Sequence, residues 1–203
     1  GHSYSFVGPT GVGKKTLAIN LAQVVNCQNQ NPPCGSCSQC SRIFRGIHPD
    51  VRVLGVNREA DQRMIGLSAI REVQQESYLE PFEGVFRVYI IDEAEKLSEE
   101  AANRFLKLLE EPPSRVIFIL LSQDSDLLLP TISSRCHQIP LRPLSKGVIS
   151  LILKNQHGAS DPEALLLACL SEGRLGWAIR AKTDPGILKQ WSDLSVKFLF
   201  LAM

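Results

Sequence analysis

The chain has 203 residues, and 22 basic against 21 acidic side chains give it a formal net charge of +1. Its hydrophobic fraction of 44% is enough to fill a core in one large domain or two small ones. Charged residues make up 21% with the signs interspersed, which argues against disorder. The near-neutral balance excludes a protein that holds nucleic acid by bulk electrostatics alone, so any role on DNA has to be shared with partners.

The sequence shows no segment suited to a membrane. Apolar runs such as Val116–Leu121 are far shorter than the roughly 18 to 20 residues that cross a bilayer. The N-terminus also lacks a basic stretch followed by an apolar one. We therefore predict a cytoplasmic protein without a membrane partner. A strand pattern begins at residue 3 and the sequence stops at Met203 inside an apolar helical stretch, so we expect a fragment of a longer protein.

Apolar runs of strand length alternate with helical patterns up to Pro143. Strands are predicted at Tyr4–Val7, Val51–Val56, Arg87–Ile91, Val116–Leu121 and Cys136–Leu141. Helices are predicted at Lys15–Val25, Ile70–Tyr78 and Glu99–Glu110. Because the strands are continuously hydrophobic, the sheet should be mostly parallel and covered by helices on both faces. The predicted fold class is α/β of the nucleotide-binding type.

Only helical patterns follow Pro143. They cover Leu144–Lys154, Asp161–Ser171, Leu175–Ala181 and Ile187–Leu201. Asp161 is the expected N-cap before Pro162, and Pro185-Gly186 is the expected linker before the last helix. We therefore expect an α/β domain over residues 1–143, a small all-helical domain over 144–183, and the start of a further, truncated helical domain over 184–203.

A glycine-rich loop follows the first predicted strand and precedes a helix. It reads Gly8-Pro9-Thr10-Gly11-Val12-Gly13-Lys14, which matches G-x-x-x-x-G-K in the context that this motif needs. Gly8, Gly11 and Gly13 let backbone amides turn toward a phosphate, and Lys14 adds a positive charge. The motif predicts a phosphate-binding ancestry.

The next position departs from that motif. A working loop has Ser or Thr there, whose hydroxyl joins the Mg²⁺ shell, and this sequence has Lys15. Thr16 follows, but one residue along a helix is a rotation of about 100°, so its hydroxyl should point away from the metal. We expect a loop built for phosphate and impaired in Mg²⁺-dependent hydrolysis. The alternative, that Lys15 tolerates or assists nucleotide binding, stays open.

Two carboxylates end the predicted strand Arg87–Ile91. In phosphate-loop enzymes the first, here Asp92, holds Mg²⁺ or its water, and the second, here Glu93, orients the attacking water. Their place about eighty residues after the loop favours this ancestry over an ordinary solvated strand end. Because the loop hydroxyl is missing, we interpret the pair as a vestigial metal site, and binding of ATP and Mg²⁺ as doubtful.

Four cysteines, Cys27, Cys34, Cys37 and Cys40, lie within fourteen residues. In a cytosolic chain this density favours metal ligands over disulfides, and four thiolates complete a closed tetrahedral Zn²⁺ site. We predict a structural zinc module over residues 27–40, with an iron–sulfur cluster or free thiols as alternatives. Cys169 stands alone and is expected in the core.

Three further segments, together with the glycine-rich loop, the four-cysteine module and His48-Pro49-Asp50, resemble the motifs of one protein family. They are Ile91-Asp92-Glu93-Ala94-Glu95-Lys96-Leu97, Ala101-Ala102-Asn103-Arg104-Phe105-Leu106-Lys107-Leu108-Leu109-Glu110-Glu111-Pro112-Pro113 and Ser134-Arg135-Cys136. Over about residues 3 to 182 the chain resembles the clamp-loader branch of the AAA+ ATPases, most specifically the delta-prime family of bacterial DNA polymerase III. The helix in the second segment also makes local sense, with Ser98 as N-cap and a buried stripe at 102, 105, 106 and 109.

The resemblance implies a ring of subunits in which ATP-bound motors open a sliding clamp and place it on primed DNA. Arg135 would then reach a neighbouring subunit's ATP site as an arginine finger. In that family, motor subunits carry a sensor arginine in the third lid helix, where this chain has Gly176. They also carry threonines at a first sensor position near Ser122 and Gln123, and the comparison at that position favours neither role. The missing loop hydroxyl and the missing lid arginine together lead us to expect a stator with little hydrolysis of its own.

Two alternatives to the stator follow. One is an ATP-hydrolysing motor subunit of the same fold, since Lys14, Asp92 and Glu93 are present. The other is a free-standing zinc-dependent nucleic-acid binder, which the near-neutral charge disfavours.

Overall fold

The computed structural model describes residues 2–56, 62–184 and 186–189. The chain divides into two compact units. The first consists of Gly1–Gly8 and Lys14–Leu141, and the second of Pro9–Gly13 and Arg142–Met203. The predicted linker residue Pro185 and the predicted helix Ile187–Leu201 beyond position 189 lie outside the described residues.

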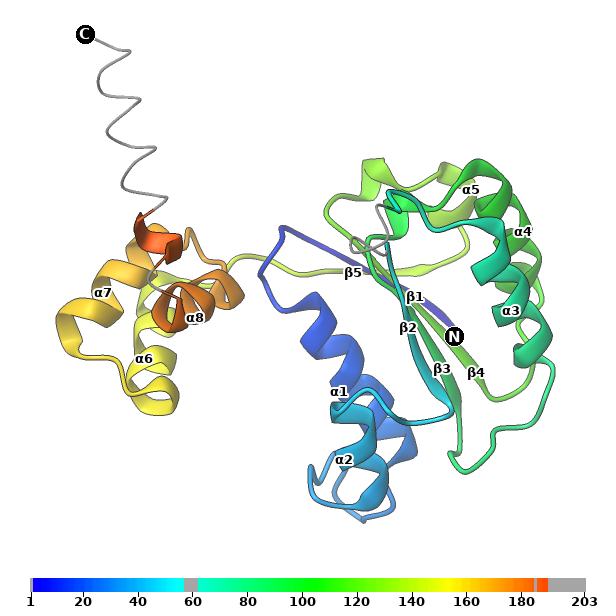
Figure 1. Cartoon of the computed structure of the whole chain (residues 1–203), viewed down its shortest axis with the longest axis horizontal. Coiled ribbons are helices and arrows are strands. Elements are labelled where there is room, and N and C mark those ends of the chain that lie inside the picture. The colour runs from blue at the N-terminus through cyan, green and yellow to red at the C-terminus, as the bar shows by residue number, and fades with distance from the viewer. Residues whose placement is uncertain (1, 57–61, 185, 190–203) are drawn as a thin grey trace, which may run out of the picture. The chain divides into compact units, whose positions relative to one another are not determined.

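A five-stranded parallel sheet forms the centre of the first unit (Figure 1). Its order is β2-β3-β4-β1-β5, so β2 and β5 are the edge strands. The strands are β1 (Ser3–Val7), β2 (Val51–Leu54), β3 (Arg87–Ile91), β4 (Val116–Ser122) and β5 (His137–Pro140). All four pairings are parallel, and β3 and β4 are almost wholly buried. Continuous hydrophobic runs thus became central strands covered on both faces, as expected.

Helices cover both faces of this sheet. On one face lie α1 (Lys14–Asn26) and α2 (Ser38–Phe44), and on the other α3 (Leu67–Ser77), α4 (Glu99–Glu110) and α5 (Pro130–Ser133). Two short 3₁₀ turns, Ala94–Lys96 and Ser125–Leu127, complete the unit. Two separate buried clusters fill the two interfaces, one centred on Phe6 and Ile119 and the other on Phe105 and Phe118.

The α4 helix follows from its local sequence. The Ser98 hydroxyl accepts a hydrogen bond from the Ala101 N–H at 3.2 Å, which caps the helix start. Its buried positions are Ala101, Ala102, Phe105, Leu108 and Leu109. Leu106, expected in the buried stripe, is only partly buried. The predicted stripe was therefore correct at positions 102, 105 and 109, whereas Leu108 takes the buried place that was expected for Leu106.

The second unit contains the helices α6 (Lys146–His157), α7 (Asp161–Leu170) and α8 (Leu175–Thr183), and residues 186–189 are also helical. Ile149, Leu153 and Leu167 lie at the centre of their shared core. The N-cap of α7 is Ser160, one residue before the predicted cap, because Ser160 and Glu163 form a capping box. Cys169, expected in the core, is exposed. No helix in the described residues is long and apolar enough to cross a membrane.

A buried carboxylate organises the loop before β3. Asp50 accepts hydrogen bonds from the N–H groups of Phe82, Glu83 and Gly84 at 2.7 to 2.9 Å, and from the Arg87 guanidinium at 3.2 Å. Burial alone would raise the pKa of Asp50, but these donors together hold it below its ordinary value. The Asp of the His-Pro-Asp segment is therefore a structural anchor.

Candidate nucleotide, metal and arginine sites

Lys14 begins α1 at the carboxyl end of β1. Its ammonium donates a hydrogen bond to the Gly8 carbonyl oxygen, the last backbone group before the loop leaves the sheet. Burial lowers the pKa of Lys14, and the nearby negative charges of Glu95 and Asp92 offset part of this fall. Both carboxylate oxygens of Glu95 are buried and accept no hydrogen bond within the described residues. The loop lysine thus lies in an acidic surrounding.

Lys15 contacts the carboxylate that ends β3. Its Nζ lies 3.1 Å from Asp92 Oδ2, and the side chains of Lys15 and Asp92 are 55% and 32% exposed. Glu93 begins the following 3₁₀ turn with a left-handed backbone (φ 54°). Thr16 is exposed on α1. The structure therefore brings Lys15 and Asp92 together across 77 positions of sequence, a contact that the motif did not predict.

This arrangement does not fit a magnesium ion held as in a hydrolysing loop. Mg²⁺ takes oxygen ligands in near-octahedral geometry. Lys15 offers no oxygen at the position of the motif's hydroxyl, and its ammonium already neutralises Asp92. An anion finds complementary charge beside Lys14 and Lys15, whereas a second cation beside Asp92 would meet the Lys15 ammonium.

The tip of the glycine-rich loop, Pro9–Gly13, belongs to the second unit. Gly11 (φ +88°) and Gly13 (φ +106°) adopt left-handed conformations that favour glycine. The Gly176 N–H at the start of α8 donates to the Gly11 carbonyl oxygen at 2.7 Å. Position 176, where motor subunits are expected to carry an arginine, is thus in backbone contact with the loop.

The four predicted metal ligands come together in the first unit. The Sγ atoms of Cys27, Cys34, Cys37 and Cys40 all lie within 4.8 Å of one another. A tetrahedral zinc site with Zn–S bonds of about 2.3 Å needs sulfur atoms about 3.8 Å apart, so the cluster fits this ion. All four are free thiols rather than disulfides.

Backbone N–H groups also point at these sulfurs. The Cys37 N–H lies 3.3 Å from Cys34 Sγ, and the Cys40 N–H lies 3.4 Å from Cys37 Sγ. The Cys37 N–H, with the Ser36 N–H and hydroxyl, lowers the pKa of Cys34 to about 5, and the Cys40 N–H lowers the pKa of Cys37. Burial raises the pKa of Cys40 to about 12. N–H donors that stabilise thiolates are the outer partners expected around bound metal.

Arg135 lies just after α5, on the sheet face opposite α1. Its guanidinium contacts Glu110 Oε1, at 2.6 Å from Nη2 and 2.9 Å from Nε, and donates to the Thr131 carbonyl oxygen at 2.9 Å. The Arg135 side chain is 36% exposed. Its neighbour Cys136 is buried, which raises the pKa of that thiol to about 11. Glu110, the last residue of α4, thus holds Arg135 at the surface, a role that sequence reasoning missed.

The family model described as "DNA polymerase III, delta subunit" matches residues 1–145. The chain belongs to this clamp-loader family. Membership is at the level of the delta, gamma and tau subunits, because relatives with these different names match the chain.

Two curated relatives show this breadth. The chain is 37% identical over 193 residues to the DNA polymerase III subunit tau of Escherichia coli (strain K12), covering 92% of this chain and 29% of that protein. It is 36% identical over 149 residues to the subunit delta' of Bacillus subtilis (strain 168), covering 73% of this chain and 44% of that protein. The chain therefore spans less than half the length of either clamp-loader relative.

Solved structures agree on the fold. A DNA polymerase III gamma subunit-related protein of Thermotoga maritima has a TM-score of 0.55 at 21% identity, covering 88% of this chain and 65% of that chain. The RuvB Holliday junction branch migration motor of the same species has a TM-score of 0.57 at 18% identity, covering 89% and 53%. Likeness at this identity shows the fold alone, and it confirms the predicted α/β fold with a parallel sheet covered by helices on both faces.

Proposed function

We propose that the parent protein is a delta-prime-like stator of the DNA polymerase III clamp loader. In this role it joins other clamp-loader subunits in a hetero-oligomeric ring, which places the sliding clamp on primed DNA. It offers Arg135 to the ATP site of a neighbouring subunit and hydrolyses little or no ATP itself.

The observation that carries this proposal is the contact between Lys15 and Asp92 at 3.1 Å. The ammonium of Lys15 stands beside the carboxylate that should bind the metal, and the same substitution removes the metal's hydroxyl ligand. Gly176 adds a second loss, because it carries no side chain to contact a γ-phosphate. Two changes of different kind thus disfavour hydrolysis by this chain.

Arg135 supports the other half of the proposal. A guanidinium can engage phosphate oxygens in pairs. Its half-exposed ion pair with Glu110 is worth about 1 kcal/mol or less, so a phosphate group of a neighbour can replace Glu110 at small cost. In the neighbour's site, the guanidinium would stabilise charge that develops on the transferred phosphoryl group.

A gamma/tau-like motor subunit is the second candidate. The 37% identity to subunit tau over 92% of this chain favours it. Lys14, Asp92 and Glu93 are also retained. On this alternative, Lys15 leaves Asp92 when nucleotide and Mg²⁺ bind.

Turnover of Mg²⁺-ATP by the full-length parent protein separates the two candidates. For the stator we expect hydrolysis no higher than that of its Lys14→Ala variant. A robust rate that disappears in the Lys14→Ala variant identifies the motor and rejects the stator, provided that the variant without nucleotide is as well folded as the unsubstituted protein.

We also propose that Cys27, Cys34, Cys37 and Cys40 hold a structural Zn²⁺. The ion would tie the segment after α1 to α2, whose first turn contains Cys40. The four thiolates would fill all four coordination positions of the ion, so we assign this site no catalytic step.

A further inference from the structure

The α3–β3 loop (residues 78–86) exposes large apolar side chains at the end of the sheet where β2 and β3 begin (Figure 1). Phe82 is 81% exposed, and Tyr78, Leu79 and Val85 are exposed as well. Side chains that stay in water cannot hold a loop in place through hydrophobic burial. The conformation of this loop therefore depends mainly on hydrogen bonds to its backbone.

Two buried side chains hold five successive amides of the loop. Asp50 accepts hydrogen bonds from the N–H groups of residues 82–84 at 2.7 to 2.9 Å. The side-chain oxygen of Asn26 accepts hydrogen bonds from the N–H groups of Val85 and Phe86 at 2.8 and 2.9 Å. Because Asp50 and Asn26 are both buried, loss of these donors would leave their oxygens unsatisfied inside the protein, which costs free energy.

One of the two acceptors is the direct neighbour of the four-cysteine module (residues 27–40). Asn26 is the last residue of α1 and precedes Cys27. Its side-chain N–H donates to the Ala22 carbonyl oxygen at 3.2 Å, which fixes the orientation of the amide. A Cβ added at Gly84 would lie 2.7 Å from the Asn26 oxygen, so the loop backbone packs directly against this side chain. The loop is thus anchored where the module begins.

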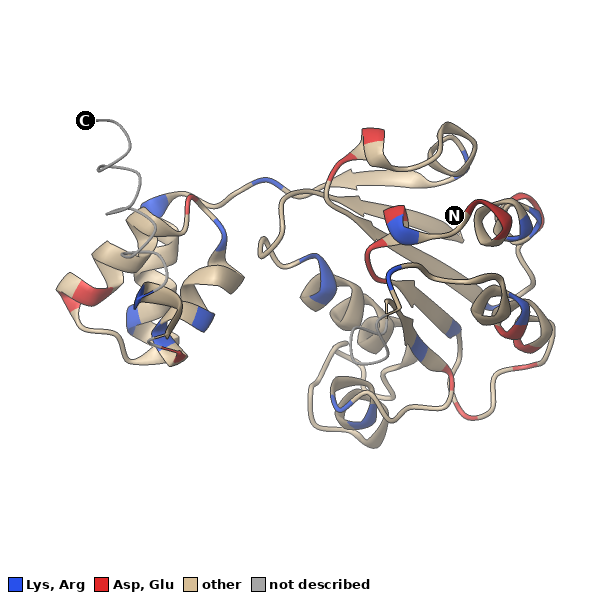
Figure 2. Ribbon diagram, turned by 45° about the horizontal axis from the view of Figure 1, so that its top comes forward, with Lys and Arg blue, Asp and Glu red and all other residues tan. Residues whose placement is uncertain are grey.

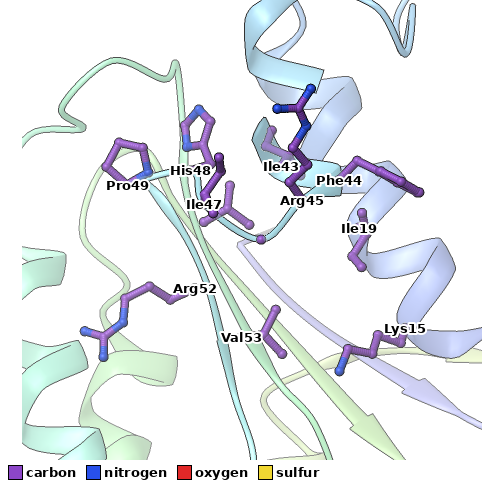
Figure 3. A pocket seen from close by; sticks show the side chains of 12 residues that line it. Lys15, Ile19, Ile43, Phe44, Arg45, Ile47, His48, Pro49, Arg52 and Val53 are labelled. Carbon is purple, nitrogen blue, oxygen red and sulfur yellow. The ribbon is translucent and has the colours of Figure 1, made fainter. Parts of the chain in front are cut away.

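A buried chain of polar contacts connects the other acceptor to the end of the module. His48 lies on the connection between α2 and β2 (Figure 3). Its Nδ1 accepts a hydrogen bond from the Asp50 N–H at 3.1 Å, so its Nε2 carries the ring proton and donates it to Gln39 Oε1. Gln39 directly precedes Cys40 on α2. Since Gln39, His48 and Asp50 are all buried, a shift of α2 would leave polar groups without partners.

An ion pair adds a direct contact from α2 to the loop. Arg42 of α2 contacts the carboxylate of Glu83. Basic residues lie at the end of α2 and acidic residues lie on the loop, so the two elements attract each other (Figure 2). Both side chains of the pair are partly exposed, so the pair contributes less than the buried contacts do.

The position of α2 depends on more than its own packing. The helix has seven residues, too few to be stable by themselves. Its buried residues are Gln39, Cys40 and Ile43, whereas Phe44 is 76% exposed. Its N-cap is Cys37, a proposed metal ligand. Little apolar surface therefore holds α2, and coordination of Cys37 and Cys40 to a metal would supply a further constraint.

We propose that the four-cysteine module serves to hold the α3–β3 loop in place. With zinc on the four thiolates, the end of α1 and the start of α2 are tied together. Asn26 then holds the loop directly, and Gln39 holds it through His48 and Asp50. This role rests on the proposed zinc site and is independent of ATP hydrolysis by the subunit. Because coupling between two sites is reciprocal, the anchored loop should also favour zinc binding.

Amide hydrogen exchange of the 203-residue chain, followed by NMR with zinc bound and after its removal by a chelator, tests this role. Removal of zinc should speed the exchange of amides 82–86 at least about 10-fold, because their acceptors lose their fixed positions. The amides of α4 are the internal control, since α4 packs on the other face of the sheet, and they should change less than about 2-fold. Equal acceleration in α4 would mean that the metal stabilises the whole unit, which overturns the proposal.

Variants outside the thiolates test the coupling in the reverse direction. Asn26→Ala removes the acceptor for two loop amides and should weaken zinc binding at least about 3-fold, measured by competition with a chromogenic chelator. Asn103→Ala, at an exposed position of α4, is the matched control and should leave zinc affinity unchanged. Arg42→Ala should speed exchange of the Glu83 amide about 3-fold, because the loop loses its ion pair with α2. Arg45→Ala is its control, since Arg45 forms no ion pair within the described part of the chain.

Failure of the zinc site and failure of this role give different results. A chain that binds no zinc rejects the metal site and this role with it. A chain that binds zinc, but whose amides 82–86 exchange at the same rate after its removal, rejects this role alone. Equal zinc affinity in Asn26→Ala and Asn103→Ala would also overturn it. If Asn26→Ala is unfolded by circular dichroism, the surface variants at Arg42 and Arg45 decide the question.

Discussion

The two faces of the central sheet each present a cation held by a carboxylate, with opposite consequences. Beside α1, Lys15 contacts Asp92 at 3.1 Å, and on the α4/α5 face, Arg135 contacts Glu110 at 2.6 Å. Both pairs are partly exposed, so each is worth about 1 kcal/mol or less in stability. The two pairs differ in whether the carboxylate is also expected to bind a metal ion. Asp92 is the residue expected to bind a metal, whereas Glu110 contacts the arginine that we propose as the finger.

The separation of these faces by a buried sheet explains how one can change without the other. The cluster under α1 and α2 and the cluster under α3 to α5 share no residue. A substitution in the loop therefore alters the α1 side while α4, α5 and Arg135 keep their packing. On the proposed stator role, this separation would let a subunit lose its own metal site and still offer an arginine to a neighbour.

The largest effect is expected from Arg135→Ala. In the reconstituted complex with only the neighbouring subunit's phosphate loop intact, ATP turnover should fall about 1000-fold, because transition-state charge loses its guanidinium partner. Assembly, measured by sedimentation, should be unchanged. Arg104→Ala is the control, since Arg104 is an exposed α4 arginine bonded to Gln74. An unchanged rate in Arg135→Ala would remove the functional role of the α4/α5 face.

The metal prediction concerns the α1 face alone. The chain should bind one zinc ion, and Cys34→Ser should weaken zinc binding by at least about 100-fold, because even outer partners of a metal site cost 10–100-fold. Competition with a chromogenic chelator measures this change. Cys169→Ser should leave affinity unaltered, since Cys169 is exposed and lies in the other unit. Equal affinity in both variants would contradict the site.

Lys15→Thr sharpens the comparison by restoring the motif. It supplies the missing hydroxyl and frees Asp92, so Mg²⁺-ATP should bind the full-length protein about 10-fold more tightly by calorimetry. Lys15→Ala separates the two contributions, because it frees Asp92 without adding an oxygen ligand. Tighter binding by Lys15→Ala than by Lys15→Thr would show that the hydroxyl is irrelevant here.

The smallest effect is expected from Glu110→Gln. Glutamine keeps a hydrogen-bond acceptor for Arg135 but removes the charge, so the complex should lose about 3-fold in ATP turnover through poorer positioning. Glu111→Gln, at the next and exposed position, is the matched control. A loss as large as that of Arg135→Ala would mean that Glu110 does more than position the arginine.

The sequence predicted best where local signals agree. The bounds of α4, Glu99–Glu110, are those expected, because Ser98 caps the start and Pro112-Pro113 prevents continuation. The four cysteines also cluster as the sequence predicts, because three of them lie within seven residues of one another. Such features depend on neighbours in sequence.

The rest depends on distant contacts or unusual caps. The α2 helix was missed because its N-cap is Cys37, whose Sγ takes the place of the usual hydroxyl or carboxylate. The predicted strand Val51–Val56 ends at Leu54, and Cys136–Leu141 shortens to His137–Pro140. The pairing of Lys15 with Asp92 and of Arg135 with Glu110 required the fold, because the partners are 77 and 25 positions apart.

The backbone contact between the loop tip and α8 limits the evolutionary routes open to this chain. A Cβ added at Gly176 would lie 3.0 Å from the Gly11 carbonyl oxygen, closer than ordinary packing allows. An arginine at position 176 would therefore require the loop or the start of α8 to shift by a few tenths of an ångström. On the proposed stator role, the return of a sensor arginine at position 176 would thus need an accompanying change in the loop or in α8, beyond the single substitution.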